Sequence, residues 1–479
     1  MHRCAFALRN SALSVDFRRE VGRFSQGEVV VKVCKFGGSS VADAQQIRQV
    51  LDVVEADPAR RIVVVSAPGK RHPEDIKVTD LLIACAEARL EGRDTGAPLQ
   101  AVLDRYTSIV EDLELDAAVQ DEIRTELRRR VDSDPANRAR YMDLMKAAGE
   151  DCTAKLVAAA LSARGTAARY INPGDAGMLL TDEPGKGRLL PESYGQLAEL
   201  KTADEVIIFP GFFGYSRDGN VVTFSRGGSD ITGAILAAAV KAEVYENFTD
   251  VDSVLAADPR IVPSARPIPE ITYREMRELS YAGFAVLHDE AIVPAVNAGI
   301  PIRICNTHRP DAPGTVIVPE HVHVSSRVVG IASAPGFCTV YVSKYLMNRE
   351  IGFGRKLLQV FEEEGLSYEH TPSGIDDMSV LLREDLFSGE KAERLIQRIR
   401  SELEADNVTV ERGLALIMIV GEGMRYNVGM AAKATAALAG AGVNIEMMNQ
   451  GSSEISMMFG VKADDRTRAV KALYGAFFA

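Results

Sequence analysis

The chain has 479 residues, of which 46% are hydrophobic and 25% charged. This length and balance exclude a small disulfide-stapled scaffold and a disordered chain, and at roughly 100–200 residues per domain they predict several globular units. The 55 Lys and Arg against 67 Asp and Glu give a net charge of −12, which argues against a nucleic-acid partner because such proteins usually present a basic face.

Cysteine usage and hydropathy indicate a cytoplasmic protein. The six cysteines form no C-x-x-C pair and no His/Cys cluster at metal spacing: Cys4, Cys34, Cys85, Cys152, Cys305 and Cys338. No apolar run reaches the roughly 18–20 residues that span a bilayer. Residues 1–28 lack the apolar core of a signal peptide. We expect no membrane partner, and we assign residues 1–28 as a leader without a function.

Residues 29–320 begin with a β-loop-α-β pattern. A β-branched apolar run over Val29–Phe36 predicts a strand buried on both faces, and glycines, a helix to about Glu55 and a second strand over Arg61–Gly69 follow. Pro98–Arg164 is a charged helical stretch, interrupted near Ser133–Pro135. Further elements are predicted at Thr166–Asn172, Glu205–Phe213, Ser229–Lys241 (a helix) and Val244–Asp250. Strands alternating with helices predict an α/β fold, an open, mainly parallel sheet with helices on both faces.

Two similar units follow a composition shift at residues 315–328. The first, 329–408, has a strand over Gly336–Ser343, a helix over Gly352–Gly365, a strand at Ser379–Arg383 and a helix over Gly389–Ala405. The second, 409–479, has a strand over Leu414–Gly421, a helix over Met430–Gly442, strands at Val443–Gln450 and Glu454–Lys462, and a closing helix. This duplication of a β-α-β-β-α-like unit constrains the fold more than any single element does.

The first chemical motif is Lys35-Phe36-Gly37-Gly38-Ser39-Ser40, between the first strand and helix. Glycines let backbone N–H groups approach a phosphate, and a lysine can neutralise the charge of a transferring phosphoryl group. An ordinary strand-to-helix turn is the alternative. The Walker and dinucleotide-binding glycine patterns are absent.

Two further motifs can hold an amino acid. Arg226, in Ser225-Arg226-Gly227-Gly228-Ser229-Asp230, can take a carboxylate bidentately, whereas Ser229 and Asp230 could be helix caps. Glu150 follows Gly149 where a helix opens, so it could also be a first-turn carboxylate that favours the helix dipole.

Together these motifs resemble those of the aspartate kinases of the amino-acid-kinase family, over about residues 30–479. The family's opening motif K-F-G-G-T-S-V reads KFGGSSV here, and its R-G-G-S-D motif is present unchanged. The resemblance implies that Lys35 and Asp230 are catalytic and that Gly37, Gly38 and Ser39 bind ATP. It also implies substrate contacts from Ser66, Thr79, Glu150, Arg226 and Ser229. Ser66 and Thr79 could equally be turn and cap residues.

The nucleotide segment carries departures from the family pattern. Residues 249–260 resemble the family's T-D-V-x-G-[VI]-Y-x-x-D-P-R, which implies ATP contacts from Thr249, Asp250, Leu255 and Arg260, with Ser253 and Leu255 replacing the usual glycine and tyrosine. Ala285, next to Val286, stands where the family has an ATP-contacting lysine. Because charge stabilisation dominates phosphoryl transfer, this change argues against full activity, unless Lys70 and Arg71 supply a replacement charge.

The two C-terminal units resemble ferredoxin-like βαββαβ ACT domains, and the last strand is expected to return to the first. The resemblance implies an amino-acid effector, lysine or threonine, and a homodimer or larger assembly through these domains. The implied effector residues are Met347, Gly352, Phe353, Ser367, Tyr368 and Glu369. Glu369 favours lysine because it could pair with the effector's ammonium. Packing alone is the alternative for these units.

The resemblance therefore implies a monofunctional aspartate kinase that converts L-aspartate and Mg-ATP to 4-phospho-L-aspartate and ADP. Mg²⁺ is expected to arrive with ATP and to have no direct protein ligand. Another amino-acid kinase of the same fold is a second alternative, and the two ACT-like units argue against it because such kinases lack tandem ACT units. A catalytically impaired nucleotide- and amino-acid-binding sensor is the alternative that Ala285 supports.

Overall fold

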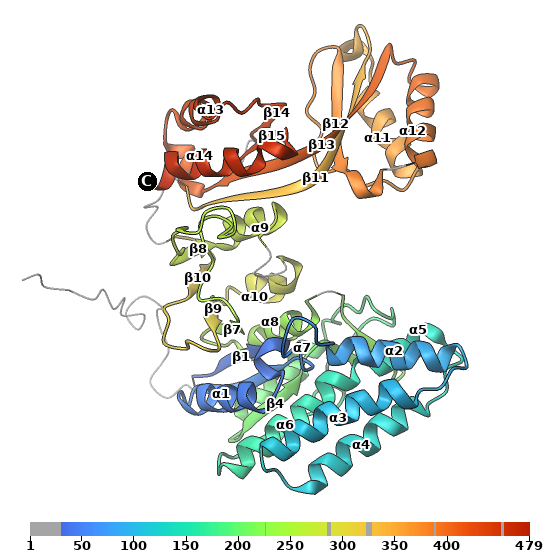
Figure 1. Ribbon diagram of the computed structural model, residues 1–479, viewed down its shortest axis with the longest axis vertical. Coiled ribbons are helices and arrows are strands. Elements are labelled where there is room, and N and C mark those ends of the chain that lie inside the picture. The colour runs from blue at the N-terminus through green and yellow to red at the C-terminus, as the bar shows by residue number, and fades with distance from the viewer. Residues whose placement is uncertain (1–29, 226, 285–288, 322–327, 388, 452–454) are drawn as a thin grey trace, which may run out of the picture. The chain divides into compact units, whose positions relative to one another are not determined.

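The five strands predicted in the N-terminal part of the chain belong to an eight-stranded sheet (Figure 1). Its other three strands, at Glu270–Thr272, Ile302–Asn306 and Thr315–Val318, were not predicted. The computed structural model describes residues 30–225, 227–284, 289–321, 328–387, 389–451 and 455–479. The expected leader and three expected site residues, Arg226, Ala285 and Val286, lie outside this set. No helix in the described part is long and apolar enough to cross a membrane.

The strand order is β3-β4-β2-β1-β7-β9-β10-β8, and every neighbouring pair is parallel except β9 and β10. This confirms the predicted open, mainly parallel sheet. The strands are β1 (Lys32–Phe36), β2 (Arg60–Val65), β3 (Ala168–Tyr170), β4 (Val206–Pro210), β7 (Tyr245–Thr249), β8 (Glu270–Thr272), β9 (Ile302–Asn306) and β10 (Thr315–Val318). A separate hairpin pairs β5 (Phe213–Tyr215) with β6 (Val221–Thr223).

The two faces of the central strands belong to different cores, because successive side chains of a strand point in opposite directions. On β1, Cys34 and Phe36 join the core beneath the helices of the charged stretch. Val33 joins the core beneath α8 (Gly228–Val240), and Lys35, two residues on, points to the same side. The register of β1 therefore directs Lys35 toward α8.

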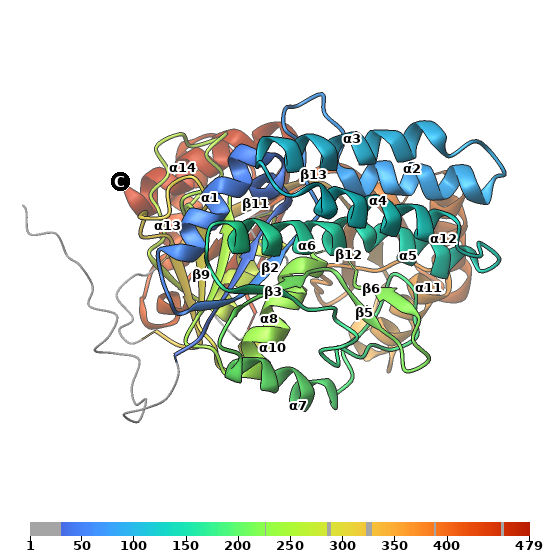
Figure 2. The same ribbon diagram turned by 90° about the horizontal axis from the view of Figure 1, so that it is seen from below.

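Helices cover both faces of the sheet, as the alternating pattern predicted (Figures 1 and 2). One layer contains α1 (Ala44–Glu55), α2 (Val78–Leu90), α3 (Gly96–Asp112), α4 (Ala117–Val131), α5 (Arg138–Lys146) and α6 (Ala148–Ala163). The predicted break near residue 133 separates α4 from α5. Also present are α7 (Ser193–Leu197), α8, α9 (Tyr273–Tyr281) and α10 (Val293–Asn297).

The C-terminal region forms one five-stranded antiparallel sheet of order β12-β11-β13-β15-β14. Its strands are β11 (Gly330–Ser343), β12 (Asp377–Arg383), β13 (Asn407–Val420), β14 (Met447–Asn449) and β15 (Ser456–Lys462). Its helices are α11 (Phe353–Glu363), α12 (Gly389–Glu402), α13 (Met430–Gly440) and α14 (Arg466–Phe478).

Two long strands connect the predicted C-terminal units. β11 and β13 have 14 residues each and pair along their whole length. Their segments Phe337–Ser343 and Asn407–Val410 lie with β12, α11 and α12, whereas Gly330–Pro335 and Leu414–Val420 lie with β14, β15, α13 and α14.

The expected strand exchange is therefore wrong in its direction. The last strand, β15, pairs with Leu414–Val420 of β13 and with β14, and does not return to the first unit. Instead the start of β11 enters the second unit. The physical reason is strand length: β11 begins at Gly330, six residues earlier than predicted, so its first half extends along β13.

Candidate active site

The centre of the candidate site is an ion pair between β1 and α8. Lys35 Nζ lies 2.6 Å from Asp230 Oδ1, and both side chains are largely buried. Asn247, which stands opposite Lys35 on β7, donates to the same Asp230 oxygen at 3.0 Å. A lysine and a carboxylate held in this way at the carboxyl ends of parallel strands lie where open α/β sheets bind ligands.

The glycine turn after β1 is packed too tightly for side chains. A Cβ on Gly38 would lie 2.9 Å from the carbonyl oxygen of Ala67, and one on Gly69 would lie 2.7 Å from Gly38 carbonyl carbon. The Gly69 amide donates to Gly38 oxygen at 2.8 Å. Ser39 is exposed on this turn. The turn is thus partly exposed at Gly37, Gly38 and Ser39, and the loop that contains Ala67 and Gly69 packs against Gly38. Glycine turns before a helix are suited to phosphate binding.

A hydroxyl pair beneath this turn was missed by the sequence interpretation. Ser40 Oγ lies 2.7 Å from Thr307 Oγ1, and both residues are buried. The two positions are 267 residues apart, and the signal that could have revealed the pair was the unexplained second serine of KFGGSS.

Glu150 has a buried carboxylate that lacks a counter-charge. The residue is 5% exposed, and its Oε2 has no hydrogen-bond partner among the described residues. Burial raises the Glu150 pKa to about 8, and hydrogen bonds from the Ala67 and Glu150 backbone amides only partly offset this effect. A buried carboxylate with an open oxygen is suited to a ligand's ammonium group. Glu150 does lie in the first turn of α6, as the alternative required, but it is buried there and is not a surface feature.

Ser66 and Thr79 lie at the two ends of the loop that connects β2 to α2. Ser66 follows β2 and its amide donates to Phe36 oxygen at 3.2 Å, and Thr79 is the second residue of α2. Both side chains are half-buried. Their substrate contacts stay predictions.

The N-terminus of α8 has no side-chain cap. Gly227 precedes it in the left-handed region (φ 74°). Gly228 packs on Phe212, where a Cβ would lie 2.5 Å from the ring, and Ser229 packs on Gly211. Asp230 is turned toward Lys35 instead of capping. The capping interpretation of Asp230 is therefore wrong.

A cavity of about 910 Å³ lies beyond the ends of β7 and β9. Thr249, Asp250, Leu255 and Arg260, the four described residues expected to contact ATP in this segment, all line it. Arg260 is 85% exposed and pairs with Asp258. Gly283 and Phe284, immediately before the expected lysine position at Ala285, also line it.

The candidate replacement cations lie next to the glycine turn. Lys70 and Arg71 follow Gly69 directly, and Lys70 Nζ donates to the Pro73 carbonyl at 3.1 Å. The Arg71 guanidinium is held by both oxygens of Asp75. Arg71 thus has a carboxylate partner already, whereas Lys70 contacts a neutral carbonyl.

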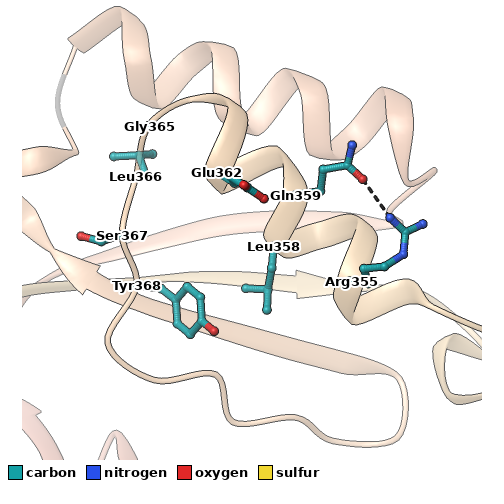
Figure 3. Close-up of a pocket in the computed structure, with 8 residues that line it drawn as sticks. All are labelled: Arg355, Leu358, Gln359, Glu362, Gly365, Leu366, Ser367 and Tyr368. Atoms are coloured by element: carbon teal, nitrogen blue, oxygen red, sulfur yellow. Dashed lines mark hydrogen bonds between the residues drawn. The ribbon is translucent and has the colours of Figure 1, made fainter.

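The expected effector residues divide into two groups. Met347 and Phe353 are buried in the core of the first C-terminal unit, and Gly352 begins α11 in the left-handed region (φ 82°). Ser367 and Tyr368 line a hollow of about 980 Å³ beside α11, where Figure 3 shows Tyr368 near Leu358. Glu369 accepts a hydrogen bond from the Tyr281 hydroxyl of α9. The structure therefore does not gather all six residues around one cavity.

Comparison with known proteins accords with this geometry. A model of the amino acid kinase family matches residues 31–306, and an ACT domain model matches residues 417–477. Aspartokinase 3 of Bacillus subtilis (strain 168) is 55% identical over 449 residues, covering 94% of this chain and 99% of its own. The chain belongs to the aspartokinases of the amino acid kinase family.

Solved aspartokinase structures share the fold. The Clostridium acetobutylicum aspartate kinase superposes with a TM-score of 0.81 at 37% identity, covering 94% of this chain and all of that one. Escherichia coli aspartokinase III with aspartate and ADP gives a TM-score of 0.73 at 25% identity, and its complex with lysine and aspartate gives 0.74 at 26%; each covers 94% of this chain and all of its own. As an aspartokinase, the chain is an aspartate kinase that uses ATP.

Proposed function

We propose that this enzyme transfers the γ-phosphoryl group of Mg-ATP to the side-chain carboxylate of L-aspartate at the site between β1, α6 and α8. The observation that supports this site best is the Lys35–Asp230 pair beside the glycine turn, together with the unpaired Glu150 carboxylate. Ala67 contacts both parts: its carbonyl faces Gly38, and its amide donates to Glu150. A cationic phosphoryl site and a buried carboxyl group that can pair with an ammonium group therefore adjoin one loop.

Each group has a distinct role in this proposal. Lys35 and the Gly38 amide stabilise the charge on the transferring phosphoryl oxygens, whereas the Gly37 amide already donates to the Phe248 carbonyl at 3.3 Å. Asp230 holds Lys35 in place, and Asn247 donates to Asp230. Glu150 binds the aspartate ammonium, and Arg226 binds its α-carboxylate. The attacking side-chain carboxylate is already ionised at neutral pH, so no general base is required. Catalysis is positioning and electrostatics without a covalent enzyme intermediate.

The magnesium ion is assigned to the nucleotide. No group of three or more His, Cys, Asp and Glu in the described ranges is arranged to hold a metal ion. Asp230 contacts Lys35, and it fits a role in ordering a metal–phosphate network. When bound, Mg²⁺ would neutralise charge on the ATP phosphates.

Regulation by an amino acid is proposed for the first C-terminal unit. Escherichia coli aspartokinase III has been solved with lysine and aspartate. Here the hollow beside Ser367 and Tyr368 is the candidate effector site, with lysine favoured over threonine. Exposed apolar residues at the turns before α11 and α13, Ile351 and Val428, support assembly of two or more copies through these units. Free buried cysteines support a cytoplasmic location.

The proposed site is tested by measuring acyl phosphate as a hydroxamate with purified protein. We expect aspartate- and ATP-dependent product, whereas a catalytically impaired sensor would bind both ligands without forming it. Glu150→Gln and Arg226→Ala should raise the aspartate KM with little change in the ATP KM. Unchanged aspartate KM in both variants would place the substrate site elsewhere.

A further inference from the structure

Two consecutive buried residues of α3 each reach a different part of the proposed site. Arg105 is 4% exposed and Tyr106 is 1% exposed, and neither belongs to the motifs that indicated the chemistry. We propose that they are positioning residues, Tyr106 for the aspartate-binding Glu150 and Arg105 for the loop that supports the phosphate-binding turn. This inference rests on the proposed function.

Tyr106 fixes the peptide that precedes Glu150. Its hydroxyl donates to the Gly149 carbonyl oxygen at 2.7 Å, and Thr153 Oγ1 donates to the same oxygen at 2.8 Å. Gly149 itself is pressed against Ala67, where a Cβ would lie 2.6 Å from that of Ala67. No side chain caps α6, so these hydroxyls help to determine where its first turn, and hence Glu150, lies.

Arg105 fixes the loop on the other side of Ala67. Its guanidinium donates to Gly69 oxygen at 2.9 Å, to Asp75 Oδ2 at 2.7 Å and to Ile76 oxygen at 3.1 Å. These three bonds join both ends of the 69–76 loop. Because the Gly69 amide in turn donates to Gly38 oxygen, Arg105 acts on the phosphate-binding turn through one intervening residue.

The contacts of Tyr106 and Arg105 act on opposite sides of Ala67. Ala67 separates Gly38 from Gly149, with no room for a Cβ on either glycine. A small displacement of either neighbour would therefore change how a ligand's phosphate and ammonium groups are presented. Misplacement of reacting groups by about 1 Å can cost roughly a hundredfold in rate.

The test separates positioning from stability by comparing two Michaelis constants. Tyr106→Phe keeps the buried ring and loses only the hydroxyl, and we expect it to raise the aspartate KM roughly tenfold while the ATP KM stays within about twofold. Arg105→Lys keeps the charge and loses the planar fork, and we expect the opposite selectivity. A merely structural role would shift both constants alike, or neither.

Matched controls remove similar groups away from the site. The buried Tyr141 hydroxyl donates to the Val131 carbonyl at 2.9 Å, so Tyr141→Phe should leave both constants unchanged. Arg60 is buried against Glu246, so Arg60→Lys is the corresponding control for Arg105. If Tyr106→Phe does not fold, Thr153→Val removes the other hydroxyl from Gly149 and should show the same aspartate-selective effect.

The Glu150→Gln variant distinguishes a failure of the proposed aspartate-binding role of Glu150 from a failure of the positioning role of Tyr106. An unchanged aspartate KM in Glu150→Gln overturns the proposed role of Glu150 in aspartate binding and the role of Tyr106 with it. A raised KM there, combined with unaltered constants in both Tyr106→Phe and Thr153→Val, overturns the role of Tyr106 alone. An unaltered ATP KM in Arg105→Lys overturns the role of Arg105.

Discussion

Lys35 Nζ and Asp230 Oδ1 are 2.6 Å apart, and a shared interaction with Asn247 fixes the carboxylate between two strands and a helix. The lysine is therefore held in position before any nucleotide binds. Such preorganised charge is effective in catalysis because no reorganisation is needed during the reaction.

Lys35→Ala should lower turnover severely while the protein stays folded. Loss of one such stabilising group typically costs about 3–4 kcal/mol, or roughly a hundred- to a thousandfold in kcat. The ATP KM should also rise, because Asp230 would be left as an uncompensated negative charge near the phosphates. The control is Lys32→Ala, whose partner is Asp57 at 2.8 Å. Activity like that of the natural protein would refute the assignment.

The affinity for aspartate should increase with pH near the raised Glu150 pKa of about 8. Below that pH the free enzyme holds Glu150 protonated, and a neutral carboxyl cannot pair with the aspartate ammonium. A profile of kcat/KM for aspartate from pH 6 to 9.5 should rise through about pH 8 and lose this step in Glu150→Gln. A profile identical in both proteins would contradict the role of Glu150.

Ionisation of Glu150 should lower the stability of the ligand-free protein as pH rises, whereas it raises the affinity for aspartate. The folded protein holds the Glu150 proton more tightly than the unfolded chain does, since the Glu150 pKa is raised from 4.5 to about 8 on folding. The protonated carboxyl is tolerated in the interior, but the charged form is not. The contribution of Glu150 to the free energy of unfolding therefore decreases as pH rises from about 4.5 to about 8. Without ligands, Glu150→Gln should therefore gain in Tm relative to the natural protein above about pH 8.

Ala285→Lys should raise kcat/KM for ATP. Phe284, the residue before it, lines the cavity that also contains Asp250 and Arg260, and the family pattern has an ATP-contacting lysine at position 285. A partly desolvated cation interacts more strongly with phosphate than a surface one does. Kinetics with varied ATP test this. If activity falls in a folded variant, another cation already serves the site, and Lys70→Ala is the next measurement.

Lysine should inhibit the enzyme more strongly than threonine if the hollow beside α11 is the effector site. An effector inhibits only if it binds a low-activity arrangement better than the active one. Inhibition titrations with Ser367→Ala and Tyr368→Ala should show weakened inhibition, because both residues line this hollow. Phe353→Ala serves as a control for module stability because that side chain belongs to the core. If neither amino acid, alone or together, changes activity or Tm, these units serve assembly only.

His321 should make stability depend on pH above neutrality. Its two ring nitrogens lie 2.8 Å from Glu270 and Glu275, and hydrogen bonding to Glu275 raises the His321 pKa to about 9. The stabilisation from protonated His321 is complete below about 6.5 and is lost as pH rises through 9. The Tm difference between the natural protein and His321→Gln should shrink over that range. The exposed His72→Gln is the control, and a pH-independent difference would contradict the ion pairs.

The sequence by itself determined the local elements and the order of the site motifs. A β-branched apolar run predicted β1, and the glycines after it predicted the turn that now adjoins Lys35 and Gly69. These features depend on backbone preferences over a few residues, so they can be predicted without a structure. The family resemblance suggested the proposed roles of Glu150 and Asp230, which single residues could not reveal.

Only the tertiary structure decided which distant residues meet. The Ser40–Thr307 pair, the placement of Asn247 beside Asp230 and the contacts of Arg105 and Tyr106 depend on strand order and helix packing. The structure also showed that β11 serves both C-terminal units, because pairing along β13 extended it beyond its apolar pattern. Contacts of this kind are set by the packing of whole layers, to which no short stretch of sequence gives a signal.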